Sequence, residues 1–327
     1  MATPHPLSRR LMVAACCASF PYVPAAFAQQ AFPSKPIRIV VPFSPGGGGD
    51  LVARKVAARL TERMGATVLV ENRAGASGNI GAEVVVRSPP DGHTVLSTSS
   101  TYGIQAALGK PPFDPVADVT PIVAIARSPA VVIVSPTSPF RTLADLINAA
   151  KRYPGEVTFG TAGVGAIAHM NFEHLASVAG VKMTHVPYKG SSQALTDMLG
   201  GNIAVTTANP MVASPMVRNK RVRALAVGGT TRLATMPDVP TFTEAGLKGY
   251  DPFDWKGMLG PKGMPKEVVA RLNAEVNAIV IEKEFAAVLE GDGSTAIGGP
   301  PDQLLALIKS DIERWRKLVR ERQIKIE

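Results

Sequence analysis

The fold of this chain follows from one stretch, Ile37-Arg38-Ile39-Val40-Val41-Pro42-Phe43-Ser44-Pro45-Gly46-Gly47-Gly48-Gly49-Asp50. Its apolar start predicts a short buried strand, which the two prolines end because proline has no N–H for a β-ladder. After the four glycines, residues 51–64 carry apolar side chains at i, i+4 spacing and predict a helix. A strand, a glycine loop and a helix N-terminus in this order leave unpaired N–H groups that suit an anion.

The kind of anion is narrowed by the residues around the glycines. No Gly-Lys-Ser/Thr sequence follows them, which excludes a P-loop. Gly47-x-Gly49, together with Glu71 at the end of the next apolar run, is half of a dinucleotide fingerprint. However, Val52 stands in place of the third glycine, and the carboxylate of Asp50 lies where a pyrophosphate would sit. A small ligand bound by backbone amides fits better, and a tight turn whose glycines only relieve strain is the alternative.

Residues 1–28 predict an export signal. Arg9 and Arg10 form a positive segment, residues 11–20 an apolar one, and Ala26-Phe27-Ala28 a cleavage site before Gln29. We therefore expect a periplasmic protein cleaved after Ala28. Residues 8–12 also resemble a twin-arginine signal, so the general secretory and twin-arginine routes both remain open.

Both cysteines of the chain, Cys16 and Cys17, lie in this signal. A lipoprotein site at Cys16 is rejected, because it would follow Arg10 too closely. The mature chain is thus expected to have no thiol and no disulfide. Its length of about 300 residues predicts two domains. The formal net charge is +9, but the basic residues are scattered, so no nucleic-acid partner is expected.

From residue 31 onward, apolar runs alternate with helical patterns, as in α/β proteins. Three polar or glycine-rich loops, residues 44–50, 71–79 and 97–101, follow three predicted strands. Ligands of open α/β sheets bind at this edge. In the second half, a strand over 157–160 leads through another glycine loop into a helix over 167–179. Two such loops facing one another would enclose a small anion between two helix dipoles.

The candidate chemistry is binding, not catalysis. The histidines lack metal-ligand spacing, Gly-x-Ser-x-Gly is absent, and the candidate loops hold no pair of carboxylates. We expect no metal, no cofactor and no catalytic residue. Asp50 and Lys189 are the only charges expected near the cleft. His169 either faces the cleft or packs locally, and long helices are predicted over 266–289 and 301–320.

At this point the chain resembles the tripartite tricarboxylate transporter receptor family (Bug-type, TctC-like) of periplasmic solute-binding proteins. The resemblance extends from about residue 32 to residue 319. It departs from the family at 205–209, where a Phe-x-Asp or similar pattern is usual, so the ligand is not identified. The matching motifs lie at 33–50, 70–82, 90–92, 163–165 before His169, 186–190, 223–227 and 237–241.

The resemblance implies a two-lobed α/β fold, the type II periplasmic binding protein or Venus flytrap. Each lobe would hold a mixed sheet flanked by helices, with two crossing segments. Residues 29–128 plus 251–327 would form lobe 1, and 129–250 lobe 2, with hinges near 127–130 and 250–254. The implied function is an extracytoplasmic receptor, a monomer, that captures a small organic carboxylate and presents it to a permease subunit or a sensor. The alternative is an exported nicotinamide-dependent oxidoreductase.

The candidate ligand-binding residues combine the polar strand ends with the loops that match the family. They are Ser44, Gly46, Gly47, Gly48, Gly49, Asp50, Ser99, Thr161, Ala162, Gly163, Val164, Gly165, Ala166, His169, Tyr188, Lys189 and Asn209.

Overall fold

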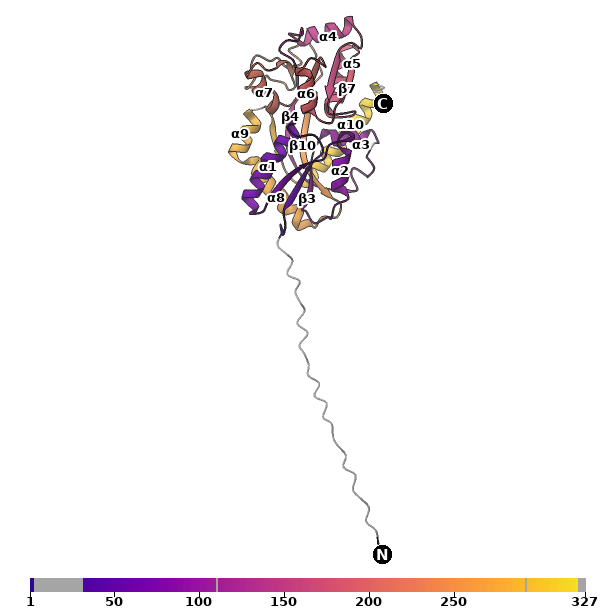
Figure 1. Cartoon of the computed structure of the whole chain (residues 1–327), viewed down its shortest axis with the longest axis vertical. Coiled ribbons are helices and arrows are strands. Elements are labelled where there is room, and N and C mark those ends of the chain that lie inside the picture. Colours follow the sequence, from indigo (N-terminus) through magenta and orange to yellow (C-terminus); the bar gives the residue numbers. More distant parts are fainter. Residues whose placement is uncertain (3–31, 110, 292, 323–327) are drawn as a thin grey trace. The chain divides into compact units, whose positions relative to one another are not determined.

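The computed structural model describes residues 1–2, 32–109, 111–291 and 293–322 (Figure 1). Residues 32–327 form a compact unit of their own. The predicted signal, its cleavage site and both cysteines lie outside the described residues, apart from Met1 and Ala2. Within the described part, no helix is long and apolar enough to cross a membrane.

The first of two sheets has six strands in the order β11-β4-β10-β3-β1-β2. β1 is parallel to β2 and β3, whereas β10 is antiparallel to β3 and β4, so the sheet is mixed. Ile37, Ile39, Val40 and Val41 of β1 are buried, as expected for a strand covered on both faces. The strand bounds are β1 Ile37–Val41, β2 Val68–Asn72, β3 Thr94–Ser99, β4 Val119–Pro129, β10 Phe253–Pro261 and β11 Thr295–Gly298.

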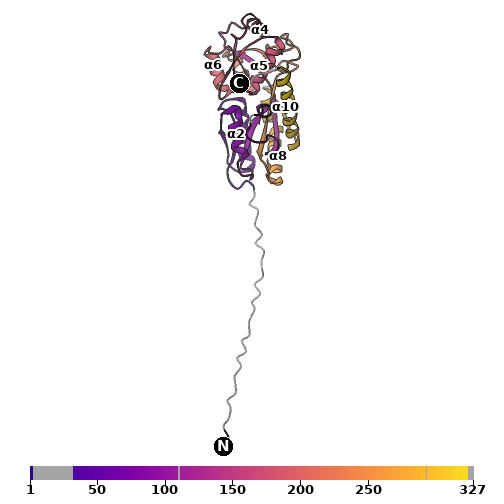
Figure 2. The same cartoon turned by 90° about the vertical axis from the view of Figure 1, so that its right-hand side faces the viewer.

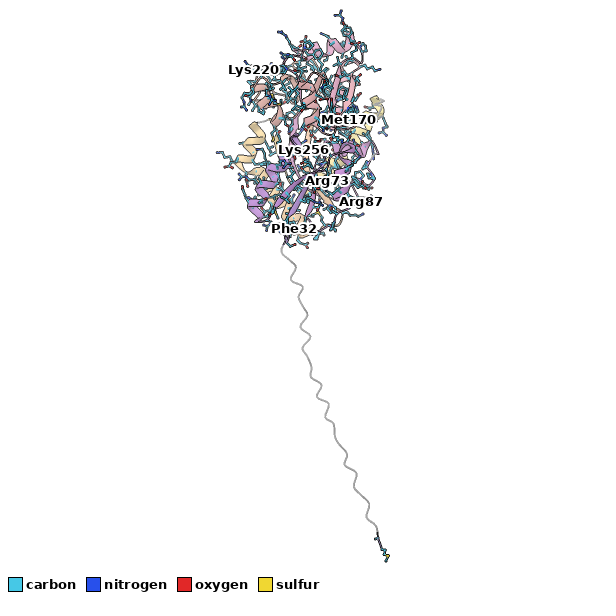
Figure 3. All side chains as sticks on the ribbon, in the orientation of Figure 1. Phe32, Arg73, Arg87, Met170, Lys220 and Lys256 are labelled. Atoms are coloured by element: carbon cyan, nitrogen blue, oxygen red, sulfur yellow. The ribbon has the colours of Figure 1, made fainter. Side chains whose placement is uncertain are left out.

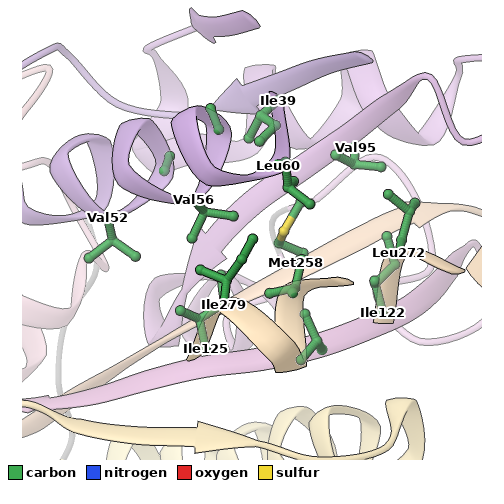
Figure 4. Packing of buried hydrophobic residues seen from close by; sticks show 14 of the residues in the cluster. Ile39, Val52, Val56, Leu60, Val95, Ile122, Ile125, Met258, Leu272 and Ile279 are labelled. Atoms are coloured by element: carbon green, nitrogen blue, oxygen red, sulfur yellow. The ribbon is translucent and has the colours of Figure 1, made fainter. Parts of the chain in front are cut away.

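Helices cover this sheet through apolar stripes. Val52, Val56 and Leu60 of α1 stand one turn apart and are buried against Met258 of β10 and Ile279 of α8 (Figure 4). The bounds are α1 Gly48–Met64, α2 Asn79–Val86, α3 Ser100–Ala107, α8 Lys266–Ile281, α9 Lys283–Gly291 and α10 Pro301–Arg322, with a 3₁₀ turn η1 at Ala76–Gly78.

The second sheet has five strands in the order β7-β6-β8-β5-β9 and its own core. Helix α4 begins with the predicted capping box, in which Thr142 and Asp145 bond each other's backbone N–H. The bounds are β5 Val131–Val134, β6 Thr158–Thr161, β7 Thr184–Pro187, β8 Val205–Ala208, β9 Arg223–Val227, α4 Leu143–Arg152, α5 Ile167–Ala179, α6 Ser191–Leu199 and α7 Pro210–Arg218.

The two sheets form two lobes, which confirms the predicted fold class. Figure 2 shows α4, α5 and α6 in one lobe and α2 and α8 in the other. β4 ends at Pro129, β5 begins at Val131, and β10 brings the chain back beside β4, with Phe253 opposite Pro129. The lobe limits and the hinge positions stay predictions.

Several elements differ from the sequence prediction. The single helix predicted over 266–289 is wrong, because extended backbone at Glu282 separates α8 from α9. The Glu282 carboxylate forms ion pairs with Arg59 and Arg63 of α1. The break also places Phe285 of α9 in the core that α8 lines. Helix α1 begins at Gly48, not at 51. Strand β11 and helices α3 and α7 were not expected; each is short, and α7 contains the proline Pro215.

Candidate functional site

A cavity of about 130 Å³ lies between the two lobes, at the carboxyl ends of β1, β3, β6 and β8. Most of the predicted site residues meet here, from both lobes. Those that line the cavity are Ser44, Gly46, Gly47, Gly48, Gly49, Asp50, Ser99, Thr161, Ala162, Ala166 and Asn209. Those that do not line it are Gly163, Val164, Gly165, His169, Tyr188 and Lys189.

Three helix N-termini reach the cavity without a cap from their own N-cap side chain, and in α5 only the first N–H, that of Ile167, is accepted by a side chain of the described residues, Thr101 Oγ1 of the first lobe. The N-cap residues are Gly47 for α1, Ala166 for α5 and Gly190 for α6, and none accepts a hydrogen bond from its own helix through a side chain. By contrast, Ser99 caps α3 and Asn209 caps α7 through side-chain oxygens. Uncapped first turns present backbone N–H groups and a partial positive charge. The cavity therefore favours an anion on both of its walls.

The Asp50 carboxylate braces the glycine loop and is 3% exposed. Its Oδ2 accepts hydrogen bonds from the N–H of Gly46 and from Arg54 Nε, both at 3.0 Å, and its Oδ1 accepts one from Asn72 at 2.9 Å. Burial alone would raise the pKa of Asp50, but the hydrogen bonds from Arg54, Gly46 and Asn72 outweigh it and hold that pKa below its ordinary value. Gly46 has φ +83, a conformation that L side chains rarely adopt. Asp50 thus shapes the loop.

The loop before α5 forms a clamp between the lobes. The carbonyl oxygen of Val164 accepts hydrogen bonds from Ser77 Oγ at 2.6 Å and Gln105 Nε2 at 3.1 Å, both from the first lobe. Gly163 has φ +119, and a Cβ there would meet Ser77 Oγ at 2.5 Å. A bulky residue at Gly163 would thus disturb backbone and clamp, not only a ligand.

His169 lies behind this loop and packs locally. Its Nδ1 accepts the N–H of Gly165 at 3.0 Å, and its ring stacks on His185 with centroids 4.0 Å apart. His185 Nε2 in turn lies 2.6 Å from Thr161 Oγ1, which lines the cavity. Burial, and secondly the neighbouring His169, lower the pKa of His185 to about 3. The two stacked rings support the loop.

Tyr188 and Lys189 point elsewhere. The Tyr188 hydroxyl donates to Asp197 at 2.7 Å, and burial together with this carboxylate raises the pKa of Tyr188 to about 12. Lys189 is exposed. Of the two charges expected near the cleft, Asp50 lines the cavity and Lys189 does not, whereas Asp254 and Lys256 line it and were not predicted. The sequence could have revealed them, because Asp254 and Lys256 are two residues apart on one strand and therefore point to the same face.

The other missed polar lining residues lie on β3, on β8 and in the first two turns of α3, α5 and α6. They are Ser97, Thr98, Thr101, Asn171, Ser191, Ser192, Thr206 and Thr207. Of these, Thr101 joins the lobes, because its Oγ1 accepts the N–H of Ile167 at 3.0 Å. The polar run at 97–101 pointed to this edge, but only Ser99 was chosen from it.

Two observations argue against a nucleotide. Glu71, the acid expected to bind a ribose, is ion-paired with Arg38 and Arg73. Val52, at the third glycine position, is buried in the core. Among the described residues, no group of three or more His, Cys, Asp or Glu side chains could hold a metal ion.

Two proteins are similar to this chain in sequence over most of its length. The chain is 40% identical over 293 residues to the UPF0065 protein in the tcbD-tcbE intergenic region of Pseudomonas sp. strain P51, covering 89% of this chain and 87% of that one. It is 33% identical over 298 residues to protein BugT of Bordetella pertussis, covering 90% and 91%.

Solved structures agree in fold as well as in sequence. Rpa4515 of Rhodopseudomonas palustris, determined with adipate, is 33% identical with a TM-score of 0.85, covering 90% of this chain and 99% of that one. MatC of the same organism, determined with bound malate, is 29% identical with a TM-score of 0.83, covering 88% and 100%. The model of the tripartite tricarboxylate transporter family receptor matches residues 52–324. The chain belongs to this family of periplasmic solute-binding receptors.

Proposed function

We propose that this chain is a periplasmic receptor that captures a small organic carboxylate in the cavity between its lobes. In this role it presents the ligand to the permease subunits of a tripartite transporter or to a sensor. It acts as a monomer, without a cofactor and without catalysing a reaction. Cleavage after Ala28 releases it into the periplasm.

The observation that carries this proposal is the meeting of three uncapped helix N-termini, those of α1, α5 and α6, at one cavity. A carboxylate accepts several N–H hydrogen bonds at once, and charge-assisted bonds are the stronger ones. The walls between the donors include apolar side chains, among them Leu195, Val212 and Ile167. Such walls suit the carbon skeleton of an organic acid. Adipate and malate in two relatives are ligands of this class.

The test is native mass spectrometry of the exported protein as purified, followed by thermal unfolding with a panel of organic acids. The panel contains adipate, malate, succinate, benzoate and acetate, with glucose and NAD⁺ as controls. A binding acid at 100 times its Kd stabilises the fold by about 2.7 kcal/mol. We expect a retained or stabilising carboxylate. A retained nucleotide, or a panel in which no acid shifts the unfolding temperature, would contradict the proposal.

A further inference from the structure

The charged side chains of the cavity all come from the first lobe. Among the lining residues they are Asp50, Asp254 and Lys256, and the lining residues of the second lobe are uncharged. Asp50 is engaged by Arg54, Gly46 and Asn72, as described above. Lys256 is therefore the basic side chain of the cavity wall, and the function proposed so far gives it no role.

Lys256 reaches the cavity because of its register on β10. Residues two apart on a strand point to the same face, so Asp254 and Lys256 share the cavity face. Trp255 points to the other face, where its Nε1 donates to Asp311 at 2.6 Å. Lys256 is 6% exposed, and its Cε lies 4.0 Å from the position that a Cβ on Gly49 would take. The side chain thus ends beside the first turn of α1. Figure 3 labels Lys256 within the whole molecule.

Lys256 and Asp254 form an ion pair in which both carboxylate oxygens accept a hydrogen bond and Lys256 keeps unused N–H donors. Asp254 Oδ1 accepts the N–H of Ser100 at 3.0 Å, and Oδ2 accepts Lys256 Nζ. An ammonium has three N–H donors. Asp254 is the hydrogen-bond partner of Nζ among the residues that the structure describes, so two donors remain for a ligand. Each oxygen of the two lining carboxylates already accepts at least one hydrogen bond from the protein.

A third donor faces the cavity from the second lobe. Asn209 Oδ1 accepts the N–H of Val212 at 3.1 Å and caps α7, but its Nδ2 is buried and has no partner in the described structure. This amide belongs to the same wall as the starts of α5 and α6. The first-lobe wall therefore offers Lys256 and α1, and the opposite wall offers Asn209, α5 and α6. Hydrogen-bond donors therefore face the cavity from both walls.

We propose that Lys256 is the specificity-determining residue of this receptor, with Asp254 as its positioning residue. Lys256 bonds one anionic group of the ligand, while the second-lobe wall holds another acceptor group. The cavity thereby selects ligands with an anionic group at each end, and it rejects those that carry an ammonium group. This inference rests on the proposed function and adds a residue that sets the ligand's charge.

The test is isothermal titration of the chain beginning at Gln29 with adipate, monomethyl adipate and 2-aminoadipate. Wild type is expected to prefer adipate over both. Lys256→Met removes charge-assisted hydrogen bonds, so the Kd for adipate should rise about 10- to 100-fold. The Kd for the monoester should change much less, so the preference for the diacid should disappear.

Control variants separate charge from folding. Lys262→Met removes an exposed lysine just beyond β10 and should leave every Kd unchanged. Lys256→Met with Asp254→Asn removes both charges of the pair, so that no carboxylate is left unpaired if the single variant is unstable. It should also lose the preference for adipate over the ester, whereas Lys256→Arg should keep it.

The outcomes distinguish the two proposals. If wild type binds adipate and the Lys256→Met chain keeps the same ratio of adipate to ester affinity, Lys256 is not the charge determinant and the receptor function stands. Equal affinity of wild type for adipate and 2-aminoadipate would also overturn the role of Lys256. If wild type binds neither these probes nor any acid of the thermal panel, the receptor function itself fails, and this inference with it.

Discussion

A Cβ added at Gly48 would block the approach of the two lobes. Gly48 is the first residue of α1, and the added atom would lie 2.1 Å from Nδ2 of Asn209 in the second lobe. Ordinary van der Waals contact begins only at 3.4 Å, so the two groups must move apart. Asn209 cannot swing away freely, because its Oδ1 caps α7. Either that cap is lost, or the lobes stay further apart.

The expected magnitude follows from these two escapes. Losing an N-cap costs about 1 kcal/mol, and overpacking a closed interface about 1–3 kcal/mol. Gly48→Ala should therefore raise the Kd for the ligand about 5- to 150-fold. The free energy of unfolding should change little, because alanine suits a helix better than glycine by up to about 1 kcal/mol, which offsets a lost cap of similar size.

The assay measures closure and affinity together. Spin labels on Leu69→Cys and Tyr153→Cys, two exposed positions attached to different sheets, report the distance between the lobes. Gly49→Ala is the matched control, since its Cβ would meet only Lys256 Cε at 4.0 Å. Adding Asn209→Ala to Gly48→Ala should restore closure. The reasoning is refuted if Gly48→Ala and Gly49→Ala give the same distances and the same affinity.

Three further predictions concern residues that support the loops. Asp50→Asn should lower the free energy of unfolding, measured in urea at pH 7, by about 1–3 kcal/mol. Because the folded pKa of Asp50 is lowered, the stabilisation from its carboxylate is present above pH 3.8 and is lost as the pH falls through the folded value. The variant should therefore show a shallower acid transition. The pKa of His185 is about 3 in the fold, below the ordinary 6.5, so the unfolded chain binds the proton first as the pH falls. The free energy of unfolding of the wild type should therefore fall by about 1–2 kcal/mol between pH 6.5 and 5. Denaturation at several pH values should show that His185→Phe abolishes this loss. Ser77→Ala removes one donor to Val164 and should weaken the closed form by about 0.5–1.5 kcal/mol, seen as a larger radius of gyration without ligand, whereas an unchanged radius would show that the clamp does not hold the lobes.

The fold could be predicted because local chemistry decides its elements. Proline ends β1, glycine allows the backbone conformation of the loop, and apolar residues at i, i+4 spacing make α1 amphipathic. Each of these features is encoded by residues that are neighbours in the sequence. The break at Glu282 could not be predicted locally, because its partners Arg59 and Arg63 belong to α1, near the other end of the sequence.

The candidate site divides in the same way. The glycine loop and the start of α5 were found from strand–loop–helix patterns. Lys256 was not found, because its place in the cavity depends on β10 entering the sheet between β3 and β4. The motif at 186–190 placed Tyr188 in the cleft, but the Tyr188 hydroxyl donates a hydrogen bond to Asp197. No local sequence pattern predicts this bond.

The position of β10 also sets an order of folding. It lies between β3 and β4 in the first sheet, yet β4 ends at Pro129 and β10 begins only at Phe253. Until this strand is synthesised, β3 and β4 share no hydrogen bonds and each has an open edge. The second sheet uses one continuous segment, residues 131–227, and can form first. Non-local pairing of this kind slows folding. We therefore expect the first lobe to be the last part of the chain to close, because a nascent chain that stops before Phe253 lacks the strand that joins β3 to β4.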